Sequence, residues 1–455
     1  MKKTFLLSCL MLAAMPVMAA YTGHVYVDKN KNGVFDQSEK PLAGIKVSDG
    51  LNVVETAADG SFTLPGHERE RFIFITTPSG YKTFNRHYHK IEKKQSGYDF
   101  GLIPYSGRIR KDGSHRYIHI TDTEIFNTEN HADWVNNVHD YARNEQAAFI
   151  IHTGDLCYEK GLKAHIKLMN TENMDCPVFY CIGNHDLVKG KYGEELFESI
   201  YGPVYYSFDA GNVHYVVTPM PGGDHAPGYT SDDVCRWLKN DLAHIRPGTP
   251  VVVFNHDLLT YEDTFIFKSK NAGSINLNEY NLKAWVYGHW HINYMKKQGD
   301  VYSVCTSSLD KGGIDHSTTA FRVMHVDSKG DFTSELRYTY LDKNICIASP
   351  AGVMASGVLP VAVNVYSSVS PVREVLYTCL ADGKPVLKNK RLLQSTDWSW
   401  NGELPLSHKY VGKELTLRVT ARFNNGEIAE AESNFICRTE KAVPLFSADW
   451  DNLSG

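Results

Sequence analysis

The feature that most constrains the fold is a series of short apolar runs that alternate with helical patterns between residues 112 and 342. Uninterrupted apolar runs of this length are typical of buried strands. Strands that alternate with helices predict an α/β domain. The runs are, in chain order, YIHIT, AAFIIHT, PVFYCI, HYVVTP, VVVFNH and AWVYGH.

Two of the intervening segments have the periodicity of amphipathic helices. In ADWVNNVHDYARNE, the side chains of Trp134, Val138 and Tyr141 share one helix face. In SDDVCRWLKNDLAHI, Ser231 can cap the N-terminus, because its hydroxyl can accept a hydrogen bond from a free backbone N–H. The apolar face of this second helix would consist of Val234, Trp237, Leu238 and Leu242.

The regions on either side of this domain have a different pattern of predicted elements. Residues 21–104 contain short strand-like segments separated by Gly, Pro and Asp, which indicates a small β-sandwich. Residues 346–440 return to strand-like segments, such as ELTLRVTARF, with NNG as a hairpin-type turn. The chain is therefore predicted to consist of a central α/β domain over residues 112–342 between two β-sandwich domains.

The N-terminus has the pattern of a secretory signal peptide over residues 1–19. Lys2 and Lys3 precede an apolar run that is shorter than the ~20 residues a spanning helix needs. We therefore expect a secreted or periplasmic protein without a transmembrane segment in the mature chain, and Cys9 lies too early for lipid anchoring. Loss of the two lysines changes 47 basic residues to 45 against 52 acidic ones, a balance that gives no electrostatic reason to bind nucleic acid.

Polar residues of the kinds that bind metals follow five of the apolar runs. Because ligands of α/β sheets bind at the carboxyl ends of the strands, these residues are candidates for one common site. The pairs Asp122 and Glu124, and His289 and His291, are each two positions apart, so on a strand both members would point to the same face. The full set is Asp122, Glu124, Asp155, Asn184, His185, Asp186, His256, His289 and His291.

The order of these residues resembles the calcineurin-like metallophosphoesterase family. The family pattern runs D-x-H, GD, GNH[DE], H and GHxH, and this chain reads DTE, GD, GNHD, NH and GHWH. The resemblance covers the central domain. It implies a four-layer αββα fold and a metal-dependent phosphoric ester hydrolase, in which a metal-bound hydroxide attacks a phosphate mono- or diester.

The resemblance also implies a role for each residue. Asp155 would bridge two metals, and His185 would act as the general acid with its imidazole oriented by Asp186. Carboxylate, imidazole and amide ligands suit manganese, iron or zinc. One metal would be completed by Asn184, His256 and His289, and the other would be held by Asp122 and His291.

Glu124 stands where the family has a histidine. Its carboxylate can ligate directly, or the ligand can be Tyr158, since GDLCY resembles the GDxxY block of purple acid phosphatases, or the position can be left to water. Two alternative functions follow. The chain can be a purple acid phosphatase-like enzyme that uses Tyr158, or a non-catalytic, metal-stabilised protein that binds the cell envelope or carbohydrate.

The segment DKNKNGVFDQSE in the N-terminal region matches the EF-hand calcium pattern, although strands and not helices flank it. It resembles the calcium loops of B-type modules in bacterial adhesins, and a polar hairpin loop is the alternative. A structural calcium ion is expected there. Its ligands would come from Asp28, Asn30, Asn32, Asp36 and Glu39.

Two Gly-rich loops, residues 220–230 and 310–316, are expected to border the site. Asp224, His225 and Asp315 are therefore candidates for contact with the substrate. That substrate would be a phosphoester, with an envelope- or carbohydrate-linked compound as one candidate.

Overall fold

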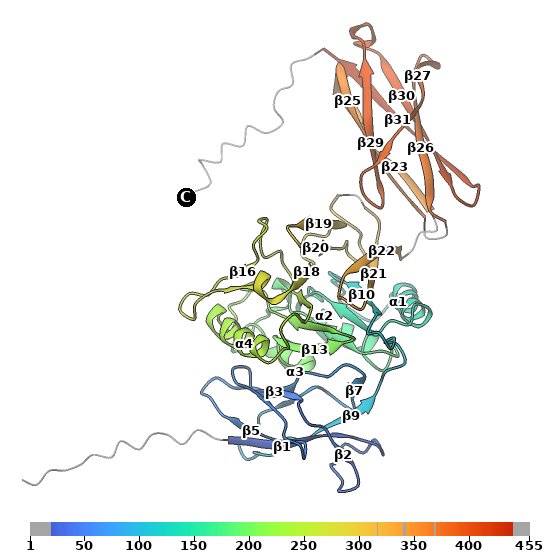
Figure 1. Cartoon of the computed structure of the whole chain (residues 1–455). Coiled ribbons are helices and arrows are strands. Elements are labelled where there is room, and N and C mark those ends of the chain that lie inside the picture. The colour runs from blue at the N-terminus through green and yellow to red at the C-terminus, as the bar shows by residue number, and fades with distance from the viewer. Residues whose placement is uncertain (1–19, 316, 340–342, 368–369, 440–455) are drawn as a thin grey trace, which may run out of the picture.

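The computed structural model describes residues 20–315, 317–339, 343–367 and 370–439, so the predicted signal peptide lies outside the described residues. The chain forms three parts arranged end to end, with the N-terminal strands at the bottom, the helix-containing part in the centre and the C-terminal strands at the top (Figure 1). Within the described ranges, no helix is long and apolar enough to cross a membrane.

The N-terminal part consists of two sheets that enclose a small apolar core. Val25, Phe62, Ile73 and Phe100 are among the buried residues between them. One sheet has the order β2-β1-β9-β7, with β5 also paired to β1, and the other has the order β4-β3-β6-β8. The strands of the first sheet are β1 (Ala20–Val27), β2 (Lys40–Pro41), β5 (Ser61–Pro65), β7 (Tyr81–Thr83) and β9 (Phe100–Pro104). Those of the second are β3 (Lys46–Ser48), β4 (Val53–Glu55), β6 (Phe72–Ile75) and β8 (Tyr88–Lys90).

Two larger sheets form the centre of the molecule. The first has the order β12-β11-β10-β21-β22, and the second has the order β13-β14-β15-β18-β20-β19. β10, β11 and β12 are parallel, as are β14, β15, β18 and β20, so each sheet brings several strand ends to one edge. The first sheet comprises β10 (His115–Ile120), β11 (Phe149–His152), β12 (Val178–Tyr180), β21 (Ala320–Val326) and β22 (Phe332–Tyr338). The second comprises β13 (Tyr206–Ala210), β14 (Val213–Val217), β15 (Val251–Phe254), β18 (Leu282–Tyr287), β19 (Tyr294–Gln298) and β20 (Val301–Cys305).

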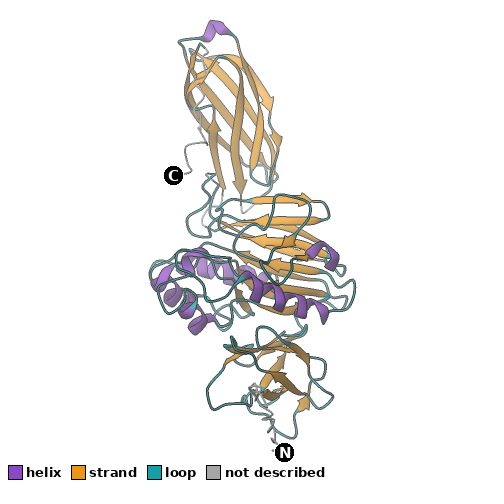
Figure 2. Ribbon diagram, turned by 90° about the vertical axis from the view of Figure 1, so that its left-hand side faces the viewer, coloured by secondary structure: helices purple, strands orange, loops and turns teal. Residues whose placement is uncertain are grey.

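Helices cover the outer faces of the two sheets (Figure 2). Trp134 of α1 (Ala132–Asn144) and Leu162 of α2 (Tyr158–Leu168) pack with strand residues of the first sheet, and α3 (Glu195–Tyr201) joins the same cluster. Trp237 of α4 (Ser231–Ala243) packs with residues of the second sheet, and Phe149 and Phe254 belong to the core that also lies between the sheets. The predicted fold class, an αββα domain with strand-rich flanks, is confirmed.

The capping residue of α4 lies one position earlier than predicted. Thr230, and not Ser231, is the capping residue: its hydroxyl accepts a hydrogen bond from Asp233 N, and the Asp233 carboxylate accepts one from Thr230 N. This reciprocal pair is a capping box. The predicted apolar face of α4 is buried as expected, whereas in α1 Ala142 takes the buried position assigned to Tyr141, which is half-buried.

The N-terminal part is docked on the central domain through buried polar contacts. Arg71 pairs with Glu194 at 2.7 Å and with Glu198 at 2.8 Å. Thr76 shares a hydrogen bond of 2.9 Å with Ser207 of the second sheet. Because broken pairs at a buried position are costly, these contacts fix the orientation of the two parts.

The C-terminal part is a sandwich of longer strands around Val363, Tyr377, Trp400 and Leu417. It meets the central domain at β22, where the rings of Tyr338 and Tyr366 lie 4.6 Å apart. One sheet contains β23 (Lys343–Ser349), β25 (Gly357–Ser367), β28 (Leu393–Gln394) and β29 (Ser399–Leu406). The other contains β24 (Gly352–Ala355), β26 (Val372–Ala381), β27 (Lys384–Arg391), β30 (Glu414–Phe423) and β31 (Ile428–Arg438).

Candidate metal centre

The predicted ligands meet where five central strands end. Three of these strands belong to the first sheet and two to the second, so the site lies where the carboxyl ends of strands from both sheets meet. Asp122 and Glu124 follow β10, Asp155 follows β11, Asn184 and His185 follow β12, His256 follows β15, and His289 and His291 follow β18.

The backbone is strained at the same kind of position in both pairs of ligands. Asp122, Glu124, His289 and His291 all have positive φ values, between 46° and 65°. The expectation that each pair shares one face of a strand is therefore wrong, because β10 ends at Ile120, β18 ends at Tyr287, and the pairs lie in the loops that follow. Left-handed non-glycine residues cost free energy and concentrate at functional sites, so the strain marks this edge as functional.

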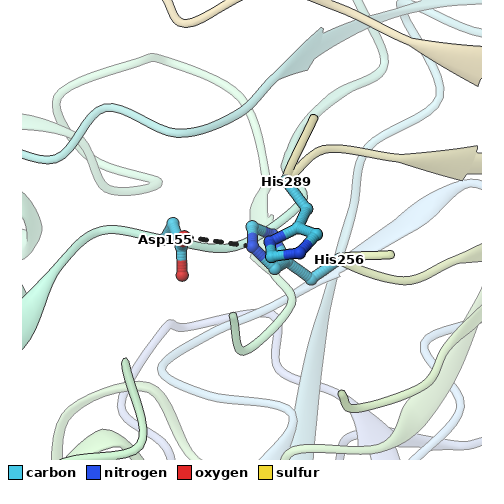
Figure 3. A group of neighbouring side chains, drawn as sticks. All are labelled: Asp155, His256 and His289. Carbon is cyan, nitrogen blue, oxygen red and sulfur yellow. Dashed lines mark ion pairs between the residues drawn. The ribbon is translucent and has the colours of Figure 1, made fainter. Parts of the chain in front are cut away.

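Asp155, His256 and His289 form the first group of ligand atoms, all within 4.8 Å of one another. Figure 3 shows the Asp155 carboxylate beside the two imidazoles, which lie against each other. His256 Nε2 is 3.1 Å from Asp155 Oδ2, and the two rings have centroids 5.0 Å apart. Burial would lower the pKa of His256, but the Asp155 carboxylate raises it to about 9.

The chemistry of this group suits a cation. His256 Nδ1 is 2.7 Å from the carbonyl oxygen of Thr153, which can only accept, so Nδ1 carries the proton. The lone pair of Nε2 then faces a carboxylate oxygen of Asp155, an arrangement that needs a proton or a cation between them. Within the described ranges, Asn184 Oδ1 is also buried without a hydrogen-bond partner. Imidazole, carboxylate and amide donors together are typical of transition metals.

Asp122, Glu124 and His291 form a second group beside the first. His291 Nε2 is 3.2 Å from Asp122 Oδ1 and 3.3 Å from Glu124 Oε1. Hydrogen bonds with these two carboxylates raise the pKa of His291 to about 10. The groups adjoin, because Asp122 Oδ1 also lies 3.9 Å from His256 Nε2. The site thus contains two adjacent groups of potential metal ligands.

Lys311 is a further member of the site that the sequence did not indicate. Its ammonium contacts Glu124 Oε2 from the loop that follows β20. Burial would raise the pKa of Glu124, but hydrogen bonds from His291 and Lys311 lower it to about 2. The glutamate and lysine together carry no net charge, like the neutral histidine of the family pattern.

Two glycines of the motifs are required because ligand-loop atoms lie where a side chain would begin. A Cβ on Gly183 would lie 2.2 Å from Asp155 Oδ1, and one on Gly288 would lie 1.9 Å from Thr121 Oγ1 and 2.8 Å from Asp122 Oδ2. Because real Cβ atoms do not come this near to other atoms, any larger residue would displace a ligand.

Asp186 does not act on His185 as predicted. It is fully buried, and its oxygens accept hydrogen bonds of 2.9 Å from the backbone N–H groups of Asp155, Gly183 and Cys157. The predicted orienting role is therefore wrong, and Asp186 instead braces two ligand loops. Burial raises the pKa of its carboxyl to about 7.

Asp224 takes the role that was expected of Asp186. Its Oδ2 lies 2.8 Å from His185 Nδ1, and its backbone N–H donates to the Asn184 carbonyl. Burial would lower the pKa of His185, but the hydrogen bond to Asp224 raises it. The imidazole is thus held with Nε2 directed away from Asp224. Tyr158, the alternative metal ligand, is 43% exposed and its ring lies 5.2 Å from that of His185.

The remaining predicted contacts are less central. Asp315 accepts hydrogen bonds from the backbone and hydroxyl of Ser317, which shape its own loop, and His225 is exposed beside Asp224. Cys157 lies within reach of Glu124 and Asp155, but burial raises the pKa of its thiol, which disfavours the thiolate that binds metals.

The N-terminal loop has the turn expected of the calcium pattern. Asp28 is buried and accepts hydrogen bonds from the backbone N–H groups of Asn32 and Gly33. Glu39 accepts from the N–H groups of Lys29 and Asp36. In the described part of the chain, its carboxylates do not form a cluster of three ligand atoms within 4.8 Å.

Comparison with known proteins gives a consistent result. The family model described as calcineurin-like phosphoesterase matches residues 115–293, and that described as the N terminal of calcineurin-like phosphoesterase matches residues 29–104. Purple acid phosphatase 13 of Arabidopsis thaliana is 26% identical over 215 residues, which are 44% of this chain and only 36% of that protein.

Similar solved structures include a purple acid phosphatase and a phosphodiesterase. A purple acid phosphatase, PPD1, from yellow lupin (Lupinus luteus) covers 89% of this chain and 73% of its own, at 12% identity and a TM-score of 0.31. A novel archaeal phosphodiesterase covers 49% of this chain and 99% of its own, at 13% identity and a TM-score of 0.25.

Proposed function

Because the chain belongs to the calcineurin-like phosphoesterase family of metal-dependent phosphoester hydrolases, we propose that it hydrolyses phosphate mono- or diesters at the edge of the two central sheets. The observation that carries the proposal is the pairing of His256 with Asp155. A protonated Nδ1 fixes the lone pair of Nε2 toward a carboxylate, beside a buried amide oxygen of Asn184.

The residues present suit two transition-metal ions, manganese, iron or zinc. Asp155, Asn184, His256 and His289 would hold one, and Asp122, Glu124 and His291 would hold the other, with Asp155 shared. Such a pair supplies charge neutralisation at the phosphoryl oxygens and lowers the pKa of a bound water. The three carboxylates of the site would be balanced in part by Lys311.

His185 has the geometry of a general acid for the departing alkoxide. The hydrogen bond between Asp224 and Nδ1 orients the imidazole of His185 and favours its protonated form, so that Nε2 can deliver a proton to the leaving oxygen. His185 N donates to Asp155 Oδ1 at 3.0 Å, which places the acid directly beside the proposed bridging ligand. Proton transfer of this kind typically contributes about 10²- to 10⁴-fold to the rate.

Turnover of a phosphoester panel by the purified chain tests the proposal. We expect hydrolysis that EDTA abolishes and that added manganese, iron or zinc restores. His185→Asn should lower kcat by about 10²-fold or more on alkyl esters, and by less on nitrophenyl esters, whose leaving group needs no proton. A folded, metal-loaded protein without EDTA-sensitive turnover would favour the non-catalytic binding protein instead.

We further propose that the protein acts outside the cytoplasm, on an envelope- or carbohydrate-linked phosphoester. The signal-like composition of residues 1–19 and the strand-rich parts on both sides of the site support this location. N-terminal sequencing of the protein from its native host would give a start near Ala20, whereas an intact Met1 would refute the secretion proposal.

The N-terminal loop is proposed as a weak structural calcium site. Calcium would draw Asp36 toward Asp28 and Glu39, whose oxygens already lie along the same turn. We expect calcium to raise the Tm of the full chain and the variant Asp28→Asn to lose that rise. An unchanged Tm in the wild type would leave a polar hairpin loop as the explanation.

A further inference from the structure

Two aromatic rings stand exposed beside the proposed general acid. Among the described residues, Phe126 is 53% exposed and Tyr158 is 43% exposed, although large aromatic side chains are usually mostly buried. Their rings are nearly parallel, at an interplanar angle of 14°, with centroids 6.2 Å apart. That separation lies within the range of about 4.5–7 Å for offset-stacked aromatic pairs, so the two rings form one aromatic surface, of which a large part stays exposed.

The pair contacts residues of the site at both ends. The ring of Tyr158 lies 5.2 Å from the imidazole of His185, and the ammonium of Lys311 lies 5.9 Å from the ring centroid of Phe126. Lys311 in turn contacts Glu124, one of the proposed ligands. The rings therefore lie between His185 on one side and the Lys311–Glu124 pair on the other.

The backbone holds Tyr158 in this position. Tyr158 begins α2 with a φ of +54°, and Cys157 before it has a φ of +71°. Two successive left-handed non-glycine residues are strained, and Asp186 stabilises the turn through its hydrogen bond from Cys157 N. A tyrosine kept exposed by a strained turn is poorly explained by packing alone.

We propose that Phe126 and Tyr158 form a stacking platform for a planar aromatic ring carried by the leaving alcohol of the substrate. The inference rests on the proposed function. His185 can protonate only the leaving oxygen, so the remainder of the leaving group must lie next to His185 and hence next to Tyr158. A planar ring there gains the offset or edge contacts that aromatic pairs favour, whereas a saturated ring does not.

Matched substrates separate the platform from intrinsic reactivity. Benzyl phosphate and cyclohexylmethyl phosphate have similar size and similarly poor leaving groups but differ in planarity. Wild type should show a kcat/KM about tenfold higher for the benzyl ester, the size expected of one stacked ring. Phe126→Leu combined with Tyr158→Leu should bring the ratio near one. Binding of benzylphosphonate, measured by calorimetry, should weaken in parallel while cyclohexylmethylphosphonate binding stays constant.

Two controls test the assignment of the rings. Tyr158→Phe keeps the ring and should keep the preference for the benzyl ester. If the Tyr158 hydroxyl instead binds a metal ion, this variant should lose that ion. Tyr261→Leu removes another exposed aromatic, which packs on Trp290, and should leave the ratio unchanged. If the double variant does not fold, the single leucine variants serve.

Different results would refute the stacking platform and the phosphoesterase activity. Equal turnover of both esters by wild type, or a preference that survives loss of both rings, would overturn the platform while leaving the phosphoesterase intact. A preference for the cyclohexyl ester would assign the rings to a saturated, sugar-like group and would also overturn the proposal. The absence of metal-dependent turnover of either ester would refute the proposed function itself.

Discussion

His214 provides a sharp test of how the N-terminal part is held on the catalytic domain. Its Nδ1 lies 2.6 Å from Asp209 and its Nε2 lies 2.8 Å from Asp241, so both nitrogens face carboxylates and both must donate. Asp241 also accepts from Ser207, which bonds Thr76 of the N-terminal part. The buried imidazolium is thus connected to the N-terminal part through Asp241 and Ser207.

The expected pH dependence follows from this geometry. Burial would lower the pKa of His214, but Asp241 and Asp209 raise it from 6.5 to about 9. The stabilisation is fully present below pH 6.5 and is lost as the pH rises through 9. Over that window the native state holds one proton more than the unfolded state, so the unfolding free energy falls by about 1.4 kcal/mol per pH unit, or roughly 3 kcal/mol in total.

The assay is guanidinium unfolding of metal-free wild type and His214→Gln between pH 6 and pH 10. His256 and His291 also titrate there when metal is absent, so the difference between the two proteins isolates His214. Because one amide cannot donate to both carboxylates, the variant should be less stable at pH 6 and nearly equal at pH 10. Parallel pH profiles would refute an imidazolium at this interface.

Three further predictions concern the loops and the interface. Asp186→Asn should lower the unfolding free energy by about 2 kcal/mol in urea titrations, because an amide nitrogen would face backbone donors; an unchanged midpoint would contradict the bracing role. Lys311→Met should tighten metal binding about fivefold in calorimetric titrations, because it frees Glu124. The control variant Lys163→Met, which breaks an exposed pair on α2, should leave the affinity unchanged. Equal metal affinities of wild type and Lys311→Met would argue against the pairing of Lys311 with Glu124. Arg71→Met should cost about 3 kcal/mol, since it leaves buried glutamates unpaired; a loss below 1 kcal/mol would show that the glutamates are neutral.

Much of the site could be predicted because the strand ends carry local signals. GD, GNHD and GHWH place each ligand directly after an apolar run, and parallel strands bring those ends to one edge. The glycines in these motifs add a constraint that the sequence displays, since Gly183 and Gly288 leave room for Asp155 and Asp122.

The errors arose where tertiary structure decides the geometry. A strand period predicts that Asp122 and Glu124 share one face, but left-handed residues beyond the strand bring their side chains together instead. Lys311 lies 187 positions from Glu124, and no local pattern announces such a pair. The sequence assigns the orientation of His185 to Asp186, whereas the structure gives it to Asp224, because adjacency in sequence says nothing about which carboxylate a buried loop turns toward its own backbone.

Metal stoichiometry per chain, determined by elemental analysis of mature wild type and Glu124→Ala, tests the central claim most directly. After exposure to manganese, iron and zinc, we predict two transition-metal ions in the wild type and about one in the variant, with calcium counted separately. Two ions in both proteins would transfer the ligand role from Glu124 to Tyr158 or water. One ion or none in well-folded wild type would contradict the two-metal site and the enzyme built on it.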